Sequence, residues 1–204
     1  MVEDGKKKKI SGSITTDQFL YNEIKITAPL YLEGKALDET SAIIAKDNLF
    51  QFPTERNTRR ITRTCYKRLD ALEDREAIEV MLNGPKDISR LINLYAIART
   101  NGLVWEFLKQ VPGEKFQNDD SSFSRKDINV FISNLQAQDE AAAKWKGSTP
   151  PHIAQILHKF LVEAGYLDSK ESTEINSIYI DELLENLIKA NHEEEILPAF
   201  HCMR

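Results

Sequence analysis

The sequence predicts a mainly α-helical protein made of two small helical subdomains. Two observations support this prediction. Apolar residues recur at helical spacing along most of the chain, and clusters of Pro, Gly, Asn and Ser separate these periodic segments. With 41% hydrophobic and 29% charged residues over 204 positions, the composition is that of a globular protein with a buried core.

The N-terminal part of the chain is expected to hold a flexible basic tail at 1–13 and a helical subdomain at 14–112. The apolar pattern predicts helices in the following places: one that starts after Thr15, Thr16 and Asp17 and ends or kinks at Pro29, one from about Asp38 to Asn48, a basic helix at 54–72, one from Asp74 to Leu82, a central helix capped by Asp87, and a short one from Leu103 to Val111 before Pro112-Gly113. The helix after Asp87 is apolar on more than one face, which favours a place in the core.

The C-terminal part, residues 124–204, is predicted to be a second helical subdomain that follows a linker near 113–123. Ser124 is expected to cap its first helix, Pro150 to begin the second and Gly165 to close it. Short strands are expected at Tyr166-Leu167 and at 175–180, followed by a helix after Asp181. This element order is that of a winged helix, with the short β-hairpin as the wing.

In that winged-helix interpretation, the helix at 150–164 would read DNA. Its outward residues would be His152, Gln155, His158 and Lys159, with Lys170 in the wing. An ordinary helical core gives the same apolar pattern, so both interpretations stay open.

Several classes of function are disfavoured by the sequence. The longest segment without Asp, Glu, Lys or Arg has twelve residues, 147–158, whereas a spanning helix needs about 20. No secretory signal is recognisable, and the two cysteines, Cys65 and Cys202, are expected to be free thiols in a reducing cytoplasm. There is no Gly-rich phosphate loop, no GxSxG motif and no metal spacing among the four histidines. We therefore expect neither an enzyme nor a cofactor.

The basic helix is the most informative feature of the sequence. Six cations and no acid fall within thirteen residues, although the whole chain has a net charge of −5. The six are Arg56, Arg59, Arg60, Arg63, Lys67 and Arg68. Without them the remaining chain carries a formal charge of −11, so the positive charge is concentrated in one segment.

The helical phase of these cations predicts a surface. At about 100° per residue, five of them fall within about 100° of arc, and the apolar residues fall on the opposite side. The five are Arg56, Arg59, Arg60, Arg63 and Lys67, opposite Ile61, Cys65, Leu69 and Leu72. Asn57, Thr58, Thr62 and Thr64 flank the five and are predicted to add phosphate contacts.

An external polyanion explains this arrangement best. Like charges at i and i+4 cost a helix a few tenths of a kcal/mol per pair, and the planar fork of arginine suits phosphate oxygens and guanine edges. Double-stranded DNA is the partner that we favour. The alternative is an acidic protein surface, either within this chain or on a partner to which the chain acts as an adaptor. Binding to an anionic membrane is disfavoured, because the opposite helix face is needed for folding.

The order and spacing of several short motifs resemble the BrxA family of bacteriophage exclusion (BREX) systems over about residues 14–180. The motifs are Tyr31-Leu32-Glu33, Asn48-Leu49-Phe50-Gln51, Thr54, Thr58-Arg59-Arg60-Ile61-x-Arg63, Arg68-Leu69-x-x-Leu72, Trp105-Glu106-Phe107-Leu108 and Phe160-Leu161-x-Glu163-Ala164-Gly165-Tyr166-Leu167. The family pattern has an acid after Arg63, where this chain has Thr64, so the helix is more basic here.

The resemblance implies a mainly helical bacterial protein that binds double-stranded DNA and has no known enzymatic activity. It also implies work beside other BREX components, which include a DNA methyltransferase, an ATPase and a phosphatase-like protein. The residues expected to contact DNA are Arg56, Asn57, Thr58, Arg59, Arg60, Arg63 and Lys67, with His152, Gln155 and Lys159 as a second contact.

Overall fold

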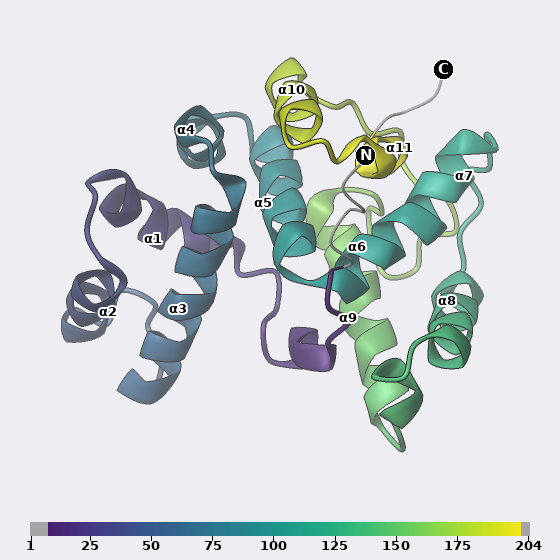
Figure 1. Cartoon of the computed structure of the whole chain (residues 1–204), viewed down its shortest axis with the longest axis horizontal. Coiled ribbons are helices and arrows are strands. Elements are labelled where there is room, and N and C mark those ends of the chain that lie inside the picture. Colours follow the sequence, from purple (N-terminus) through teal and green to yellow (C-terminus); the bar gives the residue numbers. More distant parts are fainter. Residues whose placement is uncertain (1–7, 201–204) are drawn as a thin grey trace, which may run out of the picture.

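The structure is a computed structural model that describes residues 8–200, and within that range it is built of helices (Figure 1). In chain order the elements are η1 Gly12–Thr15, α1 Tyr21–Leu32, α2 Leu37–Lys46, α3 Glu55–Leu72, α4 Arg75–Asn83, α5 Lys86–Thr100, α6 Gly102–Leu108, η2 Lys109–Gly113, α7 Glu114–Gln117, α8 Arg125–Gln138, η3 Ala142–Lys144, α9 Thr149–Ala164, α10 Glu182–Ala190, η4 Glu194–Ile196 and α11 Leu197–Phe200.

The predicted β-hairpin is wrong. In the described part of the chain the β-pairing is one isolated antiparallel bridge, between Ser122 and Glu174. Tyr166 is fully buried and donates its hydroxyl to the carbonyl of Ala199 at 2.7 Å. The residues expected to form the first strand are therefore buried by tertiary packing. Up to residue 200, the C-terminal part therefore holds helices and loops and no wing.

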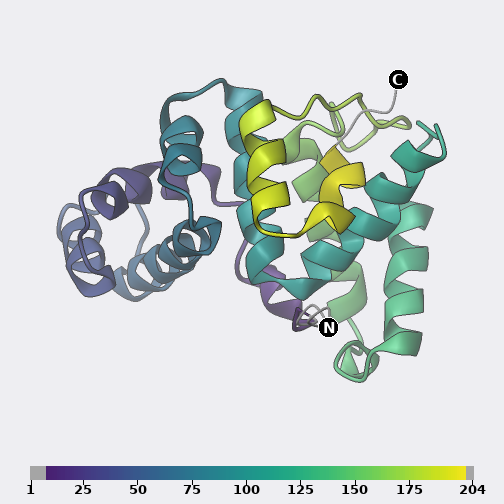
Figure 2. The same cartoon turned by 45° about the horizontal axis from the view of Figure 1, so that its top comes forward.

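Helix α5 is the central helix of the fold. Every residue from Leu91 to Ala98 is buried, as its apolar pattern predicts. In Figures 1 and 2, α1 to α4 lie on one side of α5, and α6 to α9 lie on the other side. We refer to these as the α1–α4 group and the α6–α9 group.

This division differs from the predicted one near 113–123. The chain runs from α6 through the π-helical turn η2 into α7, so helical structure continues through Pro112-Gly113. Phe107 of α6 packs on Phe131 of α8 with ring centroids 5.4 Å apart, and Phe116 of α7 stacks on Tyr166 at 6.1 Å. The contact of Phe107 with Phe131 joins the segment before 113 to a helix that follows it, and the contact of Phe116 packs the expected linker itself against Tyr166.

Pro29 does not end helix α1, which continues to Leu32. Proline leaves one carbonyl of the preceding turn without its helical donor. Here α1 packs along α3, Ile24 and Ala28 are buried, and the helix continues past the proline.

Residues 8–19 form a segment that we call the strap, which connects the two groups. The first part of the predicted tail, 1–7, lies outside the described residues. From Lys8 onward the prediction of a flexible tail does not hold, because Ile10 and Ile14 are buried and Lys8 pairs with Glu193 at 2.7 Å. Further along, Phe19 packs edge-on against Phe160 of α9 at 5.7 Å.

Candidate nucleic-acid interface

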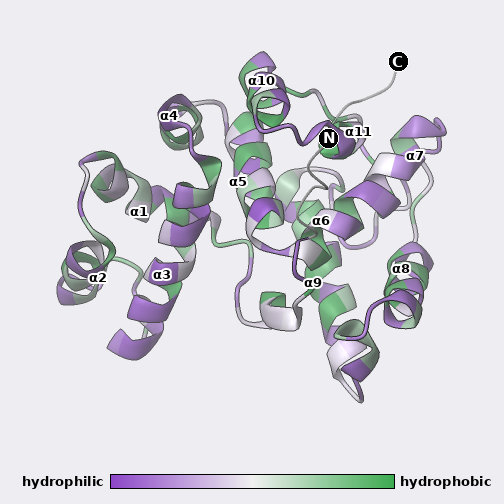
Figure 3. Ribbon diagram, in the orientation of Figure 1, coloured by the Kyte–Doolittle hydropathy of each residue, from purple (hydrophilic) through white to green (hydrophobic). Residues whose placement is uncertain are grey.

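Helix α3 begins where the sequence predicts. Thr54 is its N-cap, with its hydroxyl accepting the Asn57 N–H at 3.3 Å, and the helix continues for 18 residues to Leu72. The apolar side, which carries Ile61, Cys65 and Leu69, is buried against the other helices. Figure 3 shows the contrast between this side and the hydrophilic residues of α3.

Four of the predicted contact cations are exposed on α3: Arg56, Arg59, Arg63 and Lys67. Arg59 pairs with Glu55 one turn earlier at 2.7 Å, with 47% of its side chain exposed. Among the described residues, no carboxylate lies within ion-pair distance of Arg56, Arg63 or Lys67. The acidic remainder of the chain therefore leaves most of this surface without neutralisation. We call these four residues the cationic face.

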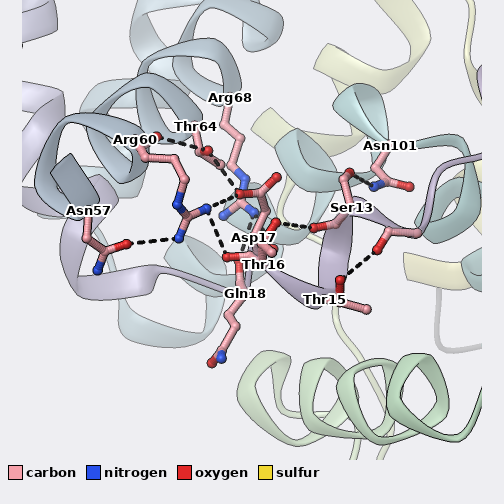
Figure 4. Close-up of polar contacts among 11 residues, drawn as sticks. Ser13, Thr15, Thr16, Asp17, Gln18, Asn57, Arg60, Thr64, Arg68 and Asn101 are labelled. Carbon is pink, nitrogen blue, oxygen red and sulfur yellow. Dashed lines mark hydrogen bonds and ion pairs between the residues drawn. The ribbon is translucent and has the colours of Figure 1, made fainter. Parts of the chain in front are cut away.

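Arg60 has a different environment. Its guanidinium pairs with Asp17 of the strap at 2.9 Å, and it also donates to the Thr16 carbonyl at 3.2 Å and to Asn57 Oδ1 at 3.1 Å (Figure 4). Thr64 donates to the same Asp17 carboxylate at 3.2 Å. The structure thus assigns Arg60, Asn57 and Thr64 to a contact between α3 and the strap.

Two of the flanking threonines cannot reach a ligand. Thr58 and Thr62 are buried, and each hydroxyl donates to the carbonyl four residues earlier. The prediction that they add phosphate contacts is wrong, because their helical phase places them beside the apolar stripe.

Arg68 is buried and acts as a clamp on the strap. Its guanidinium donates to the carbonyls of Asp17, Gln18 and Phe19 at 3.0, 2.7 and 2.9 Å. Burial lowers the pKa of this guanidinium from its ordinary value, while the neighbouring Cys65 and Asp17 act in the opposite direction. Because Arg68 holds the main chain next to Asp17, it also positions the carboxylate that binds Arg60.

No local pattern in the sequence indicates this arrangement. Asp17 lies 43 positions from Arg60 and looks like an ordinary helix-capping residue. The helical phase of Arg68 separates it from the cationic face, but its phase alone does not identify its backbone acceptors.

Only some of the α9 side chains predicted to contact DNA are exposed. His152 and Gln155 are exposed. Lys159 donates to Gln18 Oε1 at 2.9 Å and pairs with Glu163 at 3.6 Å. His158, predicted to point outward, is instead buried beside the Phe123 ring. Burial lowers the pKa of His158, and the positive charges of Arg125 and Lys170 lower it further.

The described part of the chain gives no support for a metal site, a reactive cysteine or a membrane span. Within residues 8–200 no group of three His, Cys, Asp or Glu side chains could hold a metal ion. Burial raises the pKa of the Cys65 thiol to about 12, so this cysteine stays protonated and inert. No helix in the same range has both the length and the hydrophobicity that a membrane span requires.

Within its described range, then, the chain is an all-helical protein with a cationic face on one long helix. Residues 8–192 match the family model BrxA. The BREX protein BrxA of Bacillus cereus (strain H3081.97) is 30% identical over 166 residues, which are 81% of this chain and 82% of the relative. The chain belongs to the BrxA family of BREX phage-defence systems.

A more distant relative agrees with this assignment, and a solved structure shares the fold. The BREX protein BrxA of Paramagnetospirillum magneticum (strain ATCC 700264 / AMB-1) is 22% identical over 175 residues, 86% of this chain and 87% of the relative. The crystal structure of an uncharacterized protein from Magnetospirillum magneticum superposes with a TM-score of 0.78 at 19% identity. It covers 95% of this chain and 99% of its own, which shows that the fold is shared over nearly the whole length.

Proposed function

We propose that this chain is a non-enzymatic, sequence-tolerant component of a phage-defence system that binds double-stranded DNA through the cationic face. The observation that carries the proposal is the absence of ion-pair partners, among residues 8–200, for Arg56, Arg63 and Lys67. Cations that a protein leaves unpaired on one helix face favour an external anion.

The spacing of the cationic face suits a phosphate backbone. From Arg56 to Lys67 the helix rises about 16 Å, at 1.5 Å per residue. One strand of B-DNA presents about five phosphates over that length, at about 3.4 Å of helix axis each. Four long side chains can therefore reach phosphates of one strand without reading bases, which is why sequence tolerance is expected.

The contribution of Arg59 depends on its partner. An exposed i,i+4 ion pair such as Glu55–Arg59 is worth only about 0.3–0.5 kcal/mol. A phosphate can therefore replace Glu55 at small cost, and we count Arg59 among the DNA contacts. Arg60 is left out of this count because the strap holds it.

Helix α9 is retained as a secondary contact. His152 and Gln155 are exposed in its first two turns, where the helix dipole also favours a phosphate. Lys159 would contact DNA as well only if it gave up its contacts with Gln18 and Glu163. Because the described residues form no wing, we propose that the N-terminal end of α9 contacts the DNA backbone and does not read bases.

Within the defence system, we infer that the chain works beside other BREX components. The methyltransferase, the ATPase and the phosphatase-like protein are the candidates. If the cationic face docks an acidic surface on one of them, the chain is an adaptor, and DNA binding by the isolated protein is absent.

Fluorescence anisotropy with a labelled 30-base-pair duplex tests the proposal. Micromolar or tighter binding is expected at low salt, together with its loss in the Arg59→Glu/Arg63→Glu variant while circular dichroism stays helical. Lys126→Glu is the control, because Lys126 is exposed on α8 and remote from α3 in sequence and fold. Unchanged affinity in the double variant refutes the assignment, and no binding by the wild type supports the adaptor.

A further inference from the structure

A cavity of about 430 Å³ lies where α1 begins, beside the first turns of α5 and the second half of α9. Residues 18–23, Lys86, Arg90, Lys159 and Glu163 line it. This volume falls in the range of small-molecule sites. None of the four residues of the cationic face lines it, so the cavity is distinct from that face, although Lys159 of the secondary contact on α9 is among its lining residues.

Three cations converge on this cavity. Lys86 and Arg90 come from the first two turns of α5, and no carboxylate among the described residues lies within ion-pair distance of either. The guanidinium of Arg90 lies 5.8 Å from the Tyr21 ring centre, which orients it along the cavity wall. Lys159 is the third cation, and Glu163 shares its charge.

The backbone adds donors to the same wall. Helix α1 begins after Leu20, which adopts the left-handed conformation at φ 54° and has no side-chain oxygen to cap the helix. The N–H groups of Tyr21, Asn22 and Glu23 consequently have no acceptor within residues 8–200. These three residues and the cations line the same cavity.

An acceptor without a donor completes the set. Glu163 Oε1 lies 3.6 Å from Lys159, but its Oε2 is buried with no hydrogen-bond partner in the described structure. Burial raises the pKa of this carboxyl, which is partly opposed by Lys159 and Arg90. A buried acceptor of this kind is satisfied when a ligand supplies a hydroxyl or amino group.

The charges of the lining narrow the choice of ligand. Three cations stand against two carboxylates, Glu23 and Glu163. A phosphodiester carries one negative charge, which neutralises the net positive charge of one on the lining. A phosphate monoester carries about −1.5 to −2 and leaves an excess of negative charge. The lining therefore favours a phosphodiester over a monoester.

We infer that this cavity binds the phosphodiester of a nucleotide, with the phosphate on Lys86, Arg90 and the first turn of α1, and a ligand hydroxyl or amino group on Glu163. The nucleotide comes either from a small cyclic nucleotide or from a nucleic-acid strand. The two sources share this chemistry, and the experiment separates them.

The test uses the full chain, with cyclic AMP as the phosphodiester probe, AMP as the monoester and adenosine as the control without phosphate. Isothermal titration calorimetry is expected to rank cyclic AMP above AMP and to give no signal with adenosine. In two-dimensional NMR, cyclic AMP is expected to shift the amides of Tyr21, Asn22 and Glu23. Lys86→Gln and Arg90→Gln should each weaken its binding about 10-fold or more, because each removes a charge-assisted contact. Lys126→Gln is the matched control and should leave binding unchanged.

Glu163→Gln provides a second test, since it removes one negative charge and keeps an acceptor. AMP should then gain affinity relative to cyclic AMP. The inference is overturned if no ligand shifts the three amides, if adenosine binds as well as cyclic AMP, or if neither cation variant weakens binding.

A duplex and a single strand, each added in competition, identify the source. Displacement of cyclic AMP by either polymer, with polymer affinity reduced in Arg90→Gln, assigns the site to a nucleic-acid strand. Cyclic AMP binding that neither polymer affects assigns it to a free nucleotide. Both results support a phosphodiester site, and neither depends on the cationic face of α3.

Discussion

The cationic face makes a quantitative prediction for the salt dependence of duplex binding. Each phosphate contact contributes about −0.9 to the slope of log K against log salt, so the four residues Arg56, Arg59, Arg63 and Lys67 predict a slope of about −3.6. Affinity should therefore fall about 150-fold between 50 and 200 mM salt. If the predicted set of five, including Arg60, were all in contact, the slope would be about −4.5.

Two arginine variants separate these possibilities. Arg63 is exposed and unpaired among the described residues, so Arg63→Gln should reduce the slope to about −2.7 and the salt effect to about 40-fold. Arg60 is held by Asp17 at 2.9 Å, so Arg60→Gln should leave the slope near −3.6. Both variants lose one positive charge, and a change caused by net charge alone would be equal in the two.

The assay is fluorescence anisotropy at five or more salt concentrations, with unfolding curves to establish that each variant is folded. Lys126→Gln serves as the charge control on α8. Equal slopes for wild type and Arg63→Gln would refute the reasoning, and so would a larger loss in Arg60→Gln than in Arg63→Gln.

Three further predictions concern the structure that supports this surface. Arg68→Met should lower the free energy of unfolding by about 3 kcal/mol in urea, because three carbonyls of the strap lose their donor, and a loss below about 1 kcal/mol contradicts the clamp. Gly102→Ala would place a Cβ against the carbonyls of Lys8 and Lys9, so faster hydrogen exchange is expected over residues 8–14, and unchanged exchange excludes this contact. The pKa of buried His158 is lowered in the folded protein, so the unfolded chain binds more protons and the free energy of unfolding should fall as pH drops below about 6.5. His158→Gln should make the free energy of unfolding less dependent on pH. Identical pH profiles for the variant and the wild type would show that His158 does not cause the dependence.

The parts of the fold that sequence could predict are those set by local chemistry. Thr54 caps α3, Ser124 forms a capping box with Asp127, and Gly165 closes α9 at φ 90°. Each depends on hydrogen bonds or backbone angles within a few residues. The exposure of the α3 cations could be predicted as well, because helical phase depends only on spacing along one helix.

The wrong predictions have a common cause in tertiary packing. Pro29 and Pro112 are local helix breakers, but in the folded chain each lies within continuous helical structure. The residues at 166–167 have strand-like composition, but they are buried, and Tyr166 bonds to Ala199 of α11. The Asn176 N–H donates to the Tyr166 carbonyl at 2.8 Å, and this single bond does not extend into a hairpin. Local signals rank the alternatives of a short segment, whereas contacts from distant segments decide among them.

The candidate site shows the same limit in Arg60, whose partner comes from a segment predicted to be mobile or helical. This contact also suggests that the strap reduces the charge available to DNA. Asp17 neutralises one of five cations, so Asp17→Ala should release Arg60 and move the salt slope from about −3.6 toward −4.5. Duplex affinity at low salt should rise, although the protein loses an ion pair and becomes slightly less stable. Asp17→Ala combined with Arg60→Gln should return the slope to the wild-type value. If Asp17→Ala instead weakens binding, the strap holds Arg60 in a position that DNA requires, and Arg60 returns to the set of phosphate contacts.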